Sequence, residues 1–428
     1  MERNFSHYKI CKGLNFNTIR DERFKTGRLS VTMFLPLDRQ TASVYALLPF
    51  VLTNSCRKYP DITSLNQQLA ALYGASLFSD VSKIGDMQAL TVGVSFLDDK
   101  FALEGESLSS QLTQLLCDIL FDPLLENETF TENVVTQEKR QLMELLDSEY
   151  NDKKILAKTR CEQLMCKNEK FGVNRLGDKE SAAKITSKAV FEAWETALKT
   201  ARIEIMALGD LDEKAAFAVF KTAWEKIKRE EIINCETQIV KKADNVKEQY
   251  DNMDIAQSKL VMGFRTNAAL MDPKVMATRV AVALFGATPQ SKLFLNVREK
   301  LSLCYYCSAK YDRNKGIMMV QSGVEKRNID KAKAEILNQL EEIKKGNFTE
   351  SALEDTKRSL ANSYRTIGDF LSGLENFYLA QVFDDEFLPP EKFVESMYKV
   401  TRTEVIDAAK NITLDTVYAL VGKEEAAK

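Results

Sequence analysis

The chain has 428 residues and a formal net charge of −3, and 45% of its residues are hydrophobic. This composition is typical of a globular protein, and the length suggests two to three domains. The balanced charge argues against nucleic acid and against an anionic membrane as partners.

Histidine is nearly absent, because His7 is the only one in the chain. Zinc hydrolases commonly use two or three histidine ligands, and Ser-His or Cys-His catalysis needs a suitably placed histidine. We interpret His7, in a polar N-terminal stretch, as a surface residue. Any chemistry must therefore run without imidazole or take place on another chain.

The N-terminus lacks the apolar core of a signal peptide, and the longest apolar run, Tyr45 to Leu52, is too short to cross a bilayer. Eight scattered cysteines indicate a reducing compartment rather than a disulfide framework. We therefore expect a cytoplasmic protein with no membrane segment.

Hydrophobic periodicity and turn residues predict alternating groups of strands and helices. In chain order, we expect strands within 8–40, a helix from Ala42 to Asn54 that is kinked at Pro49, a helix from Thr63 to Tyr73, a hairpin from Gly74 to Phe96, an amphipathic helix from Leu103 to Leu120 and a long helical stretch from Thr131 to Met165. This order fits an α+β fold, with mainly antiparallel sheets and helices packed on one face of each.

The second half of the chain repeats features of the first. The stretch that begins Phe-Thr-Glu at Phe130 reappears at Phe348, and two further matches follow in the same order. We therefore predict two tandem homologous domains, at 1–215 and 245–428. The stretch from Lys226 to Asn252 is charge-rich, and the region 216–244 is expected to be the linker between them.

A helix that turns into a strand is predicted between Ser291 and Tyr306. Arg298 lies beside the apolar stripe of this helix, and Tyr305 lies near the start of the strand. Arginine suits a peptide carbonyl or carboxylate, and a tyrosine hydroxyl can donate to an oxyanion. From the residues alone, a solvated helix face and a sheet rim remain the simpler interpretations. The expected stripe consists of Leu293, Phe294, Val297 and Leu301.

Nearby, Cys304 and Cys307 form a C-x-x-C pattern. Residues three apart on a regular strand point to opposite faces, so the two thiols could not chelate a metal together. We therefore expect no metal or redox role for this pair.

The motif Leu-Phe-x-x-Val-Arg-Glu-Lys-x-x-Leu-x-Tyr, from Leu293 to Tyr305, resembles that of the pitrilysin/insulinase-like metallopeptidases, the inverzincins. The resemblance covers the whole chain, including its two similar halves. It implies a substrate-binding role for Arg298 and an oxyanion-side role for Tyr305. Ser302 departs from the pattern, because the family usually has glycine there.

Active members of that family carry H-x-x-E-H on a helix of the first half, which binds zinc and activates water. The matching segment places Ala46, Pro49 and Phe50 at the histidine, glutamate and histidine positions. None of the three can bind zinc or act as a base, and no shift of the alignment recovers a histidine. The family's further glutamate ligand would fall near Glu138 to Leu146, and we assign it no role.

The resemblance thus implies a catalytically incomplete subunit with no metal or other cofactor in this chain. Its expected partner is a zinc-bearing H-x-x-E-H paralogue, with which it forms a heterodimer that acts on a peptide or unfolded polypeptide. The alternative is a non-enzymatic scaffold or peptide-binding protein of the same fold. Within the family, the overall pattern is most similar to the histidine-less members of Gram-positive bacterial pairs associated with elongation factor P 5-aminopentanol modification.

Overall fold

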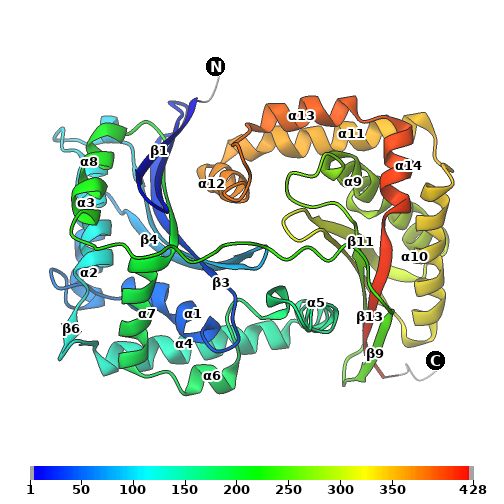
Figure 1. Ribbon diagram of the computed structural model, residues 1–428, viewed down its shortest axis with the longest axis horizontal. Helices are drawn as coiled ribbons and strands as arrows, with labels where there is room; N and C mark the ends of the chain where they lie inside the picture. The colour runs from blue at the N-terminus through cyan, green and yellow to red at the C-terminus, as the bar shows by residue number, and fades with distance from the viewer. Residues whose placement is uncertain (1–3, 424–428) are drawn as a thin grey trace. The chain divides into compact units, whose positions relative to one another are not determined.

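The structure is a computed structural model that describes residues 4–423 (Figure 1). It divides into two compact units. Unit 1 comprises Met1–Asp147, Val173–Glu236 and Asp369–Leu379, and unit 2 comprises Ser148–Gly172, Thr237–Gly368 and Ala380–Lys428. Each unit therefore includes one short segment from the opposite half of the chain. The homology of 1–215 with 245–428 stays a prediction, since compactness does not test it.

Unit 1 is built on a six-stranded sheet in which only β2 and β8 pair in parallel. Across the sheet, the strands are β1 (Asn4–Cys11), β2 (Leu14–Arg20), β8 (Arg202–Leu208), β3 (Thr26–Pro36), β5 (Met87–Leu97) and β4 (Ser76–Ile84). Side chains alternate between the two faces of a strand. Along β3, Leu29, Val31 and Met33 accordingly enter the hydrophobic core.

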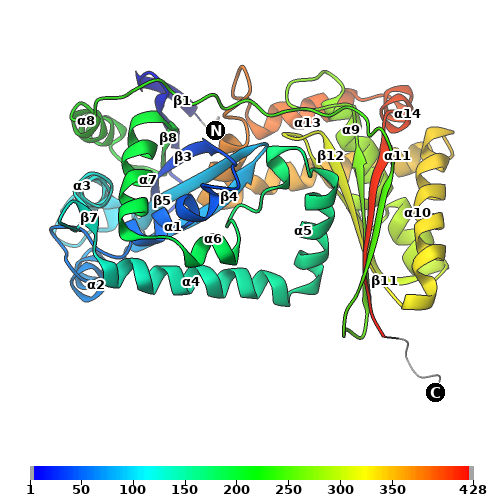
Figure 2. The ribbon, with the colours of Figure 1, turned by 60° about the horizontal axis from the view of Figure 1, so that its bottom comes forward.

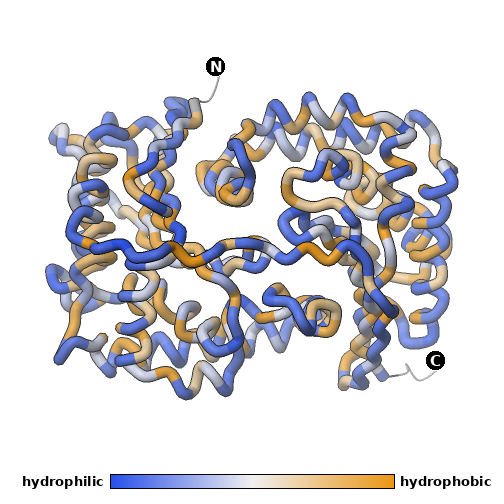
Figure 3. Tube along the Cα trace, viewed as in Figure 1, coloured by the Kyte–Doolittle hydropathy of each residue, from blue (hydrophilic) through white to orange (hydrophobic). Residues whose placement is uncertain are grey.

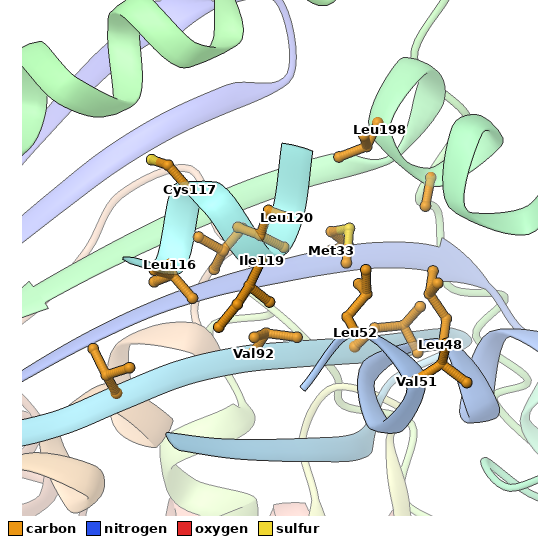
Figure 4. Close-up of a cluster of buried hydrophobic side chains, with 14 of the residues drawn as sticks. Met33, Leu48, Val51, Leu52, Val92, Leu116, Cys117, Ile119, Leu120 and Leu198 are labelled. Atoms are coloured by element: carbon orange, nitrogen blue, oxygen red, sulfur yellow. The ribbon is translucent and has the colours of Figure 1, made fainter. Parts of the chain in front are cut away.

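Helices cover the core face of this sheet. They are α1 (Ala42–Leu52), α2 (Ile62–Ala71), α3 (Leu108–Phe121), α4 (Glu132–Asn151), α6 (Lys179–Ala183), α7 (Ser187–Thr200) and α8 (Glu213–Trp224), and the short hairpin β6 (Leu125–Glu126) with β7 (Thr129–Phe130) lies among them. Figure 4 shows Leu48 of α1 and Ile119 of α3 in the cluster that also contains Met33 and Val92 of the sheet. The face that these helices cover is thus the apolar one.

Two predicted helices have different bounds because a side chain caps a later start. The stretch from Thr131 to Met165 is broken at Asp152, whose carboxylate accepts from the amides of Lys154 and Ile155 and so begins a second helix, α5 (Lys153–Met165). The helix expected from Leu103 starts only at Leu108, because Ser107 caps it. The expected helix that contains Pro49 and the hairpin that follows Gly74 are both present.

Unit 2 is built on a five-stranded sheet in which only β13 and β9 are parallel. Across the sheet, the strands are β11 (Cys304–Asp312), β12 (Ile317–Val324), β10 (Ser258–Arg265), β13 (Thr413–Val421) and β9 (Lys247–Asn252). Besides α5, the helical segments of this unit that have five or more residues are α9 (Val275–Val282), η3 (Ala283–Ala287), η4 (Leu293–Lys300), α10 (Ile329–Lys344), α11 (Glu350–Arg365), α13 (Pro390–Lys399) and α14 (Arg402–Lys410). Figure 2 shows this sheet edge-on, with α10 alongside it.

A single helix from the opposite half of the chain packs on each sheet. On the sheet of unit 2, Cys161 and Met165 of α5 pack against Val261 and Met319. On the sheet of unit 1, α12 (Leu371–Leu379) contacts β3 and β8. The prediction of an α+β fold with two helix-packed sheets is confirmed. Helices nevertheless lie on both faces of the unit 1 sheet rather than on one, because Glu375 of α12 contacts Arg28 and Ser30 of β3, whereas the alternate residues of β3 face the core. Both sheets are mixed rather than wholly antiparallel.

The surface helices are amphipathic, and Figure 3 shows hydrophobic and hydrophilic residues interleaved along them. Within residues 4–423, no helix combines the length and the hydropathy needed to cross a bilayer. The region 216–244 begins inside α8, and residues 228–246 contain no helix or strand.

Candidate functional site

The helix that matches the zinc motif offers no metal ligand. Ala46 and Pro49 of α1 are buried, and Phe50 is half-buried against the same core. Across residues 4–423, no group of three or more histidine, cysteine, aspartate or glutamate side chains is arranged to hold a metal. The donor set therefore does not fit zinc, and no catalytic step can run through a metal bound at α1.

Glu138, the first residue of the range in which the family's further zinc ligand would fall, has side-chain amides as hydrogen-bond partners. Glu138 of α4 is buried and accepts a hydrogen bond of 2.9 Å from the Asn54 side chain. Burial raises the pKa of Glu138, and the hydrogen bond from Asn54 only partly opposes this. We interpret this pair as a structural contact between α4 and the end of α1.

Arg298 and Tyr305 lie in unit 2, on either side of the predicted turn from helix to strand. The helix, η4, is a π-helix, because the Leu301 amide donates to the Asn296 carbonyl five residues earlier, at 3.1 Å. Leu293 and Val297 are buried as predicted, whereas Leu301 is exposed. The α-helical spacing that placed Leu301 on the stripe does not hold here. Each hydrogen bond of a π-helix spans five residues instead of four, so residues eight apart no longer share a face.

Arg298 projects from the last turn of η4 and is exposed. Its guanidinium carbon lies 4.7 Å from the centre of the Phe294 ring, and its Nε lies 3.5 Å from Glu299 Oε1. The cation–π contact orients the side chain, and the surface ion pair contributes little. The guanidinium is thus positioned while it stays open to solvent.

Tyr305 is the extra residue of a β-bulge. Cys304 pairs with Val324 and Tyr306 pairs with Gly323, so Tyr305 has no residue opposite it on β12. Bulges re-aim a side chain, and Tyr305 is 67% exposed. Since β11 is an edge strand of the sheet, the phenol lies at its rim.

The bulge also overturns the prediction that Cys304 and Cys307 face opposite ways. One inserted residue reverses the alternation of side chains, so Cys304 opposite Val324 and Cys307 opposite Ser322 share a face. Cys304 and Cys307 thus occupy neighbouring positions on that face. Sequence reasoning found the C-x-x-C pattern and missed the pairing, because no residue in it marks a bulge.

Ser302, in the turn between η4 and β11, has a φ of +48°, which a glycine would adopt with less strain. We expect Ser302→Gly to raise the stability of unit 2 by up to about 1 kcal/mol, since the strain relieved exceeds the added chain entropy. Urea unfolding followed by circular dichroism measures this. The matched change Ser363→Gly, inside α11, should lower stability. Equal losses in both variants would contradict our explanation.

A groove of about 470 Å³ lies in unit 1, between α2 and β4. Apolar side chains such as Leu65, Leu69 and Phe78 line it together with Thr53 and Ser79. Within the described residues, β4 pairs only with β5, so no strand occupies its other edge, although the Val81 carbonyl of β4 accepts a hydrogen bond of 2.9 Å from Arg175 Nε. Open edges can accept a further strand.

Residues 184–360 match the family model described as "Peptidase M16 inactive domain". A Bacillus subtilis protein named probable inactive metalloprotease YmfF is 32% identical over 418 residues, which are 97% of each chain. The match therefore extends over nearly the full length of both proteins.

Solved structures share the fold. A conserved protein from Enterococcus faecalis superposes with a TM-score of 0.91 and 28% identity, over 99% of this chain and 100% of that one. A protease from Helicobacter pylori, at 13% identity, has a TM-score of 0.78 over 98% of this chain and 100% of its own. The second likeness concerns the fold alone.

Proposed function

Because the chain belongs to the M16 peptidase family, we propose that it is a catalytically incomplete subunit of a heterodimeric zinc peptidase. Its partner would be a paralogue with the H-x-x-E-H site, and both would lie in the cytoplasm. The apolar surroundings of Ala46 and Pro49 support the loss of zinc from this chain. The name of the Bacillus relative, a probable inactive metalloprotease, agrees with this.

The observation that carries the proposal is the exposure of Arg298 and Tyr305 at one junction of helix and strand. A π-helix and a bulge, both often found at functional sites, present the two side chains to solvent. Tyr305 would donate its phenol proton in a hydrogen bond to the developing oxyanion, and Arg298 would bind a neighbouring substrate carbonyl. Zinc in the partner would supply the activated water.

The open edge of β4 supports a peptide as substrate. An extended peptide would pair its backbone with β4, while its side chains enter the groove beside Leu65 and Leu69. Backbone pairing favours an extended or unfolded polypeptide over a folded protein. The sequence of the peptide would be selected only loosely, because backbone pairing does not depend on the identity of the side chains.

Activity of the heterodimer tests the proposal. We expect Tyr305→Phe, and likewise Arg298→Ala, to cost about 3 kcal/mol of barrier, on the order of a hundredfold in kcat, because one transition-state donor is lost. Peptide hydrolysis by the co-expressed pair measures this. Tyr398→Phe and Arg327→Ala are exposed controls of the same residue types and should keep full activity.

Full activity in both test variants would instead favour the second candidate, a non-enzymatic scaffold or peptide-binding protein. The open edge of β4 also favours that function, because strand addition needs no chemistry. Peptide binding by this chain alone, unchanged by Tyr305→Phe, would then be the expected result. The association with elongation factor P modification stays a prediction from the resemblance, and the pair's effect on that factor would test it.

A further inference from the structure

Cys304 and Cys307, which lie on either side of Tyr305 in the sequence, are neighbours on the folded strand. They occupy neighbouring positions on one face of β11 because of the bulge. Cys304 is half-buried and Cys307 is buried beside it. A reagent in solvent therefore reaches the Cys304 thiol first, and the Cys307 thiol is shielded from solvent.

Cys304 is also the more acidic thiol of the pair. The neighbouring Cys307 thiol lowers the pKa of Cys304 to about 7, and Ser322 and the charge of Arg298 lower it further, whereas burial acts in the opposite direction. The neighbouring Cys304 and burial both raise the pKa of Cys307. At neutral pH a large fraction of Cys304 is therefore thiolate, which is the nucleophilic form.

Other cysteines in the chain differ in this respect. Cys117, Cys161 and Cys166 are buried in the cores, and burial raises the pKa of each. Cysteines of that kind pack as small apolar residues and are chemically inert. The pair on β11 is thus distinguished by both its geometry and its environment.

We propose that Cys304 and Cys307 form a redox-active dithiol site that exchanges reversibly with low-molecular-weight disulfides. The Cys304 thiolate attacks a sulfur of the small disulfide, which forms a mixed disulfide and releases one small thiolate. Cys307 then loses its proton and attacks Cys304 Sγ, which releases the second small thiol. Overall, the protein dithiol is oxidised to an intramolecular disulfide and one small disulfide is reduced to two thiols.

The position of Tyr305 gives the site a consequence for the proposed function. Tyr305 lies between the two cysteines, so the disulfide closes a small ring that contains it. The bond fixes the bulge from which the phenol projects. Oxidation thereby couples the redox state of the surroundings to the orientation of a substrate-binding side chain.

The experiment treats the reduced full chain with glutathione disulfide, alkylates the remaining thiols and digests with trypsin. Cleavage after Lys300 and Lys310 yields one peptide, Leu301–Lys310, that contains both cysteines. We expect oxidation to protect both cysteines of this peptide from alkylation together. The oxidised peptide should be lighter by two hydrogen atoms than its reduced, unalkylated form. Reduced glutathione should restore both thiols. In a separate time course at pH 7, Cys304 should alkylate roughly tenfold faster than the half-buried Cys11.

Variants separate the two steps. Cys307→Ser should stop at a stable glutathione adduct on Cys304, Cys304→Ser should leave Cys307 unmodified, and Cys11→Ser should behave as wild type. Two alkylated thiols in the wild-type peptide at every glutathione ratio would overturn the proposal. Because the measurement uses this chain alone, without partner or substrate, its outcome is independent of the proposed peptidase role.

Discussion

Replacement of Arg265 by alanine is expected to destabilise unit 2 by about 3–5 kcal/mol, the cost of breaking a buried ion pair. Arg265 lies on β10 and is only 2% exposed. Its Nη2 is 2.6 Å from Glu169 Oε1, and its Nε is 2.8 Å from Asp415 Oδ2. Removal of the guanidinium leaves two buried carboxylates with too little positive charge.

Lys315 completes this buried network, whose contribution to stability depends on pH through Glu169. Its Nζ lies 2.8 Å from Glu169 Oε2. Burial would raise the pKa of Glu169, but hydrogen bonds from Arg265 and Lys315 outweigh it and lower that pKa. A lowered folded-state pKa contributes stability above the unfolded value, about 4.3, which is lost as the pH falls through the folded value. We therefore expect Arg265→Ala to reduce this acid-side loss of stability.

Urea unfolding followed by circular dichroism measures the destabilisation, and hydrogen exchange of the β10 amides assigns it to this sheet. The control is Arg140→Ala, which removes an exposed arginine and its i,i+4 pair with Glu144 and should change stability by less than about 1 kcal/mol. A midpoint for Arg265→Ala as high as that of the control would show that the network is energetically neutral.

A matching contact exists in unit 1. Glu375 of α12 is buried, accepts a hydrogen bond from Ser30 and pairs with Arg28 at 2.5 Å. Glu375 lies in the short segment of unit 1 that comes from the opposite half of the chain, and Glu169 lies in the corresponding segment of unit 2. Each of these segments thus brings a buried carboxylate to an arginine on a strand. A charged residue on a helix or in a turn is normally a solvated one, so the sequence predicts neither contact.

Local patterns were sufficient to predict most of the first half's helices, its hairpin after Gly74 and the turn from η4 to β11. The turn at Ser302 and the exposure of Arg298 follow from features that adjacent residues encode. The bulge at Tyr305 and the π-helix depend on pairing with β12 and on packing of η4, which involve residues distant in sequence. The missed pairing of Cys304 with Cys307 follows from the same limit.

Helix α8 shows the same limit at the level of domains. The charge around 226–244 suggested a linker that starts at 216, yet Phe220 and Trp224 of α8 are buried in the core of unit 1. Phe220 packs near Phe16, with ring centres 6.2 Å apart, and Trp224 meets Phe121 edge-on at 4.9 Å. Two aromatic anchors therefore join this helix to the sheet and to α3.

We expect Phe220→Ala to destabilise unit 1 by about 3–5 kcal/mol, through lost transfer free energy and the cavity that remains. Both tryptophans of the chain, Trp194 and Trp224, lie in unit 1, so tryptophan emission during urea unfolding reports this unit. Phe370→Ala is the matched control, because that ring is 70% exposed and its loss should cost less than about 0.5 kcal/mol. If both variants unfolded at the wild-type midpoint, α8 would be an appendage rather than part of the core. The burial of Phe220 at 0% exposure argues for the core, because a fully enclosed ring cannot be removed without a void.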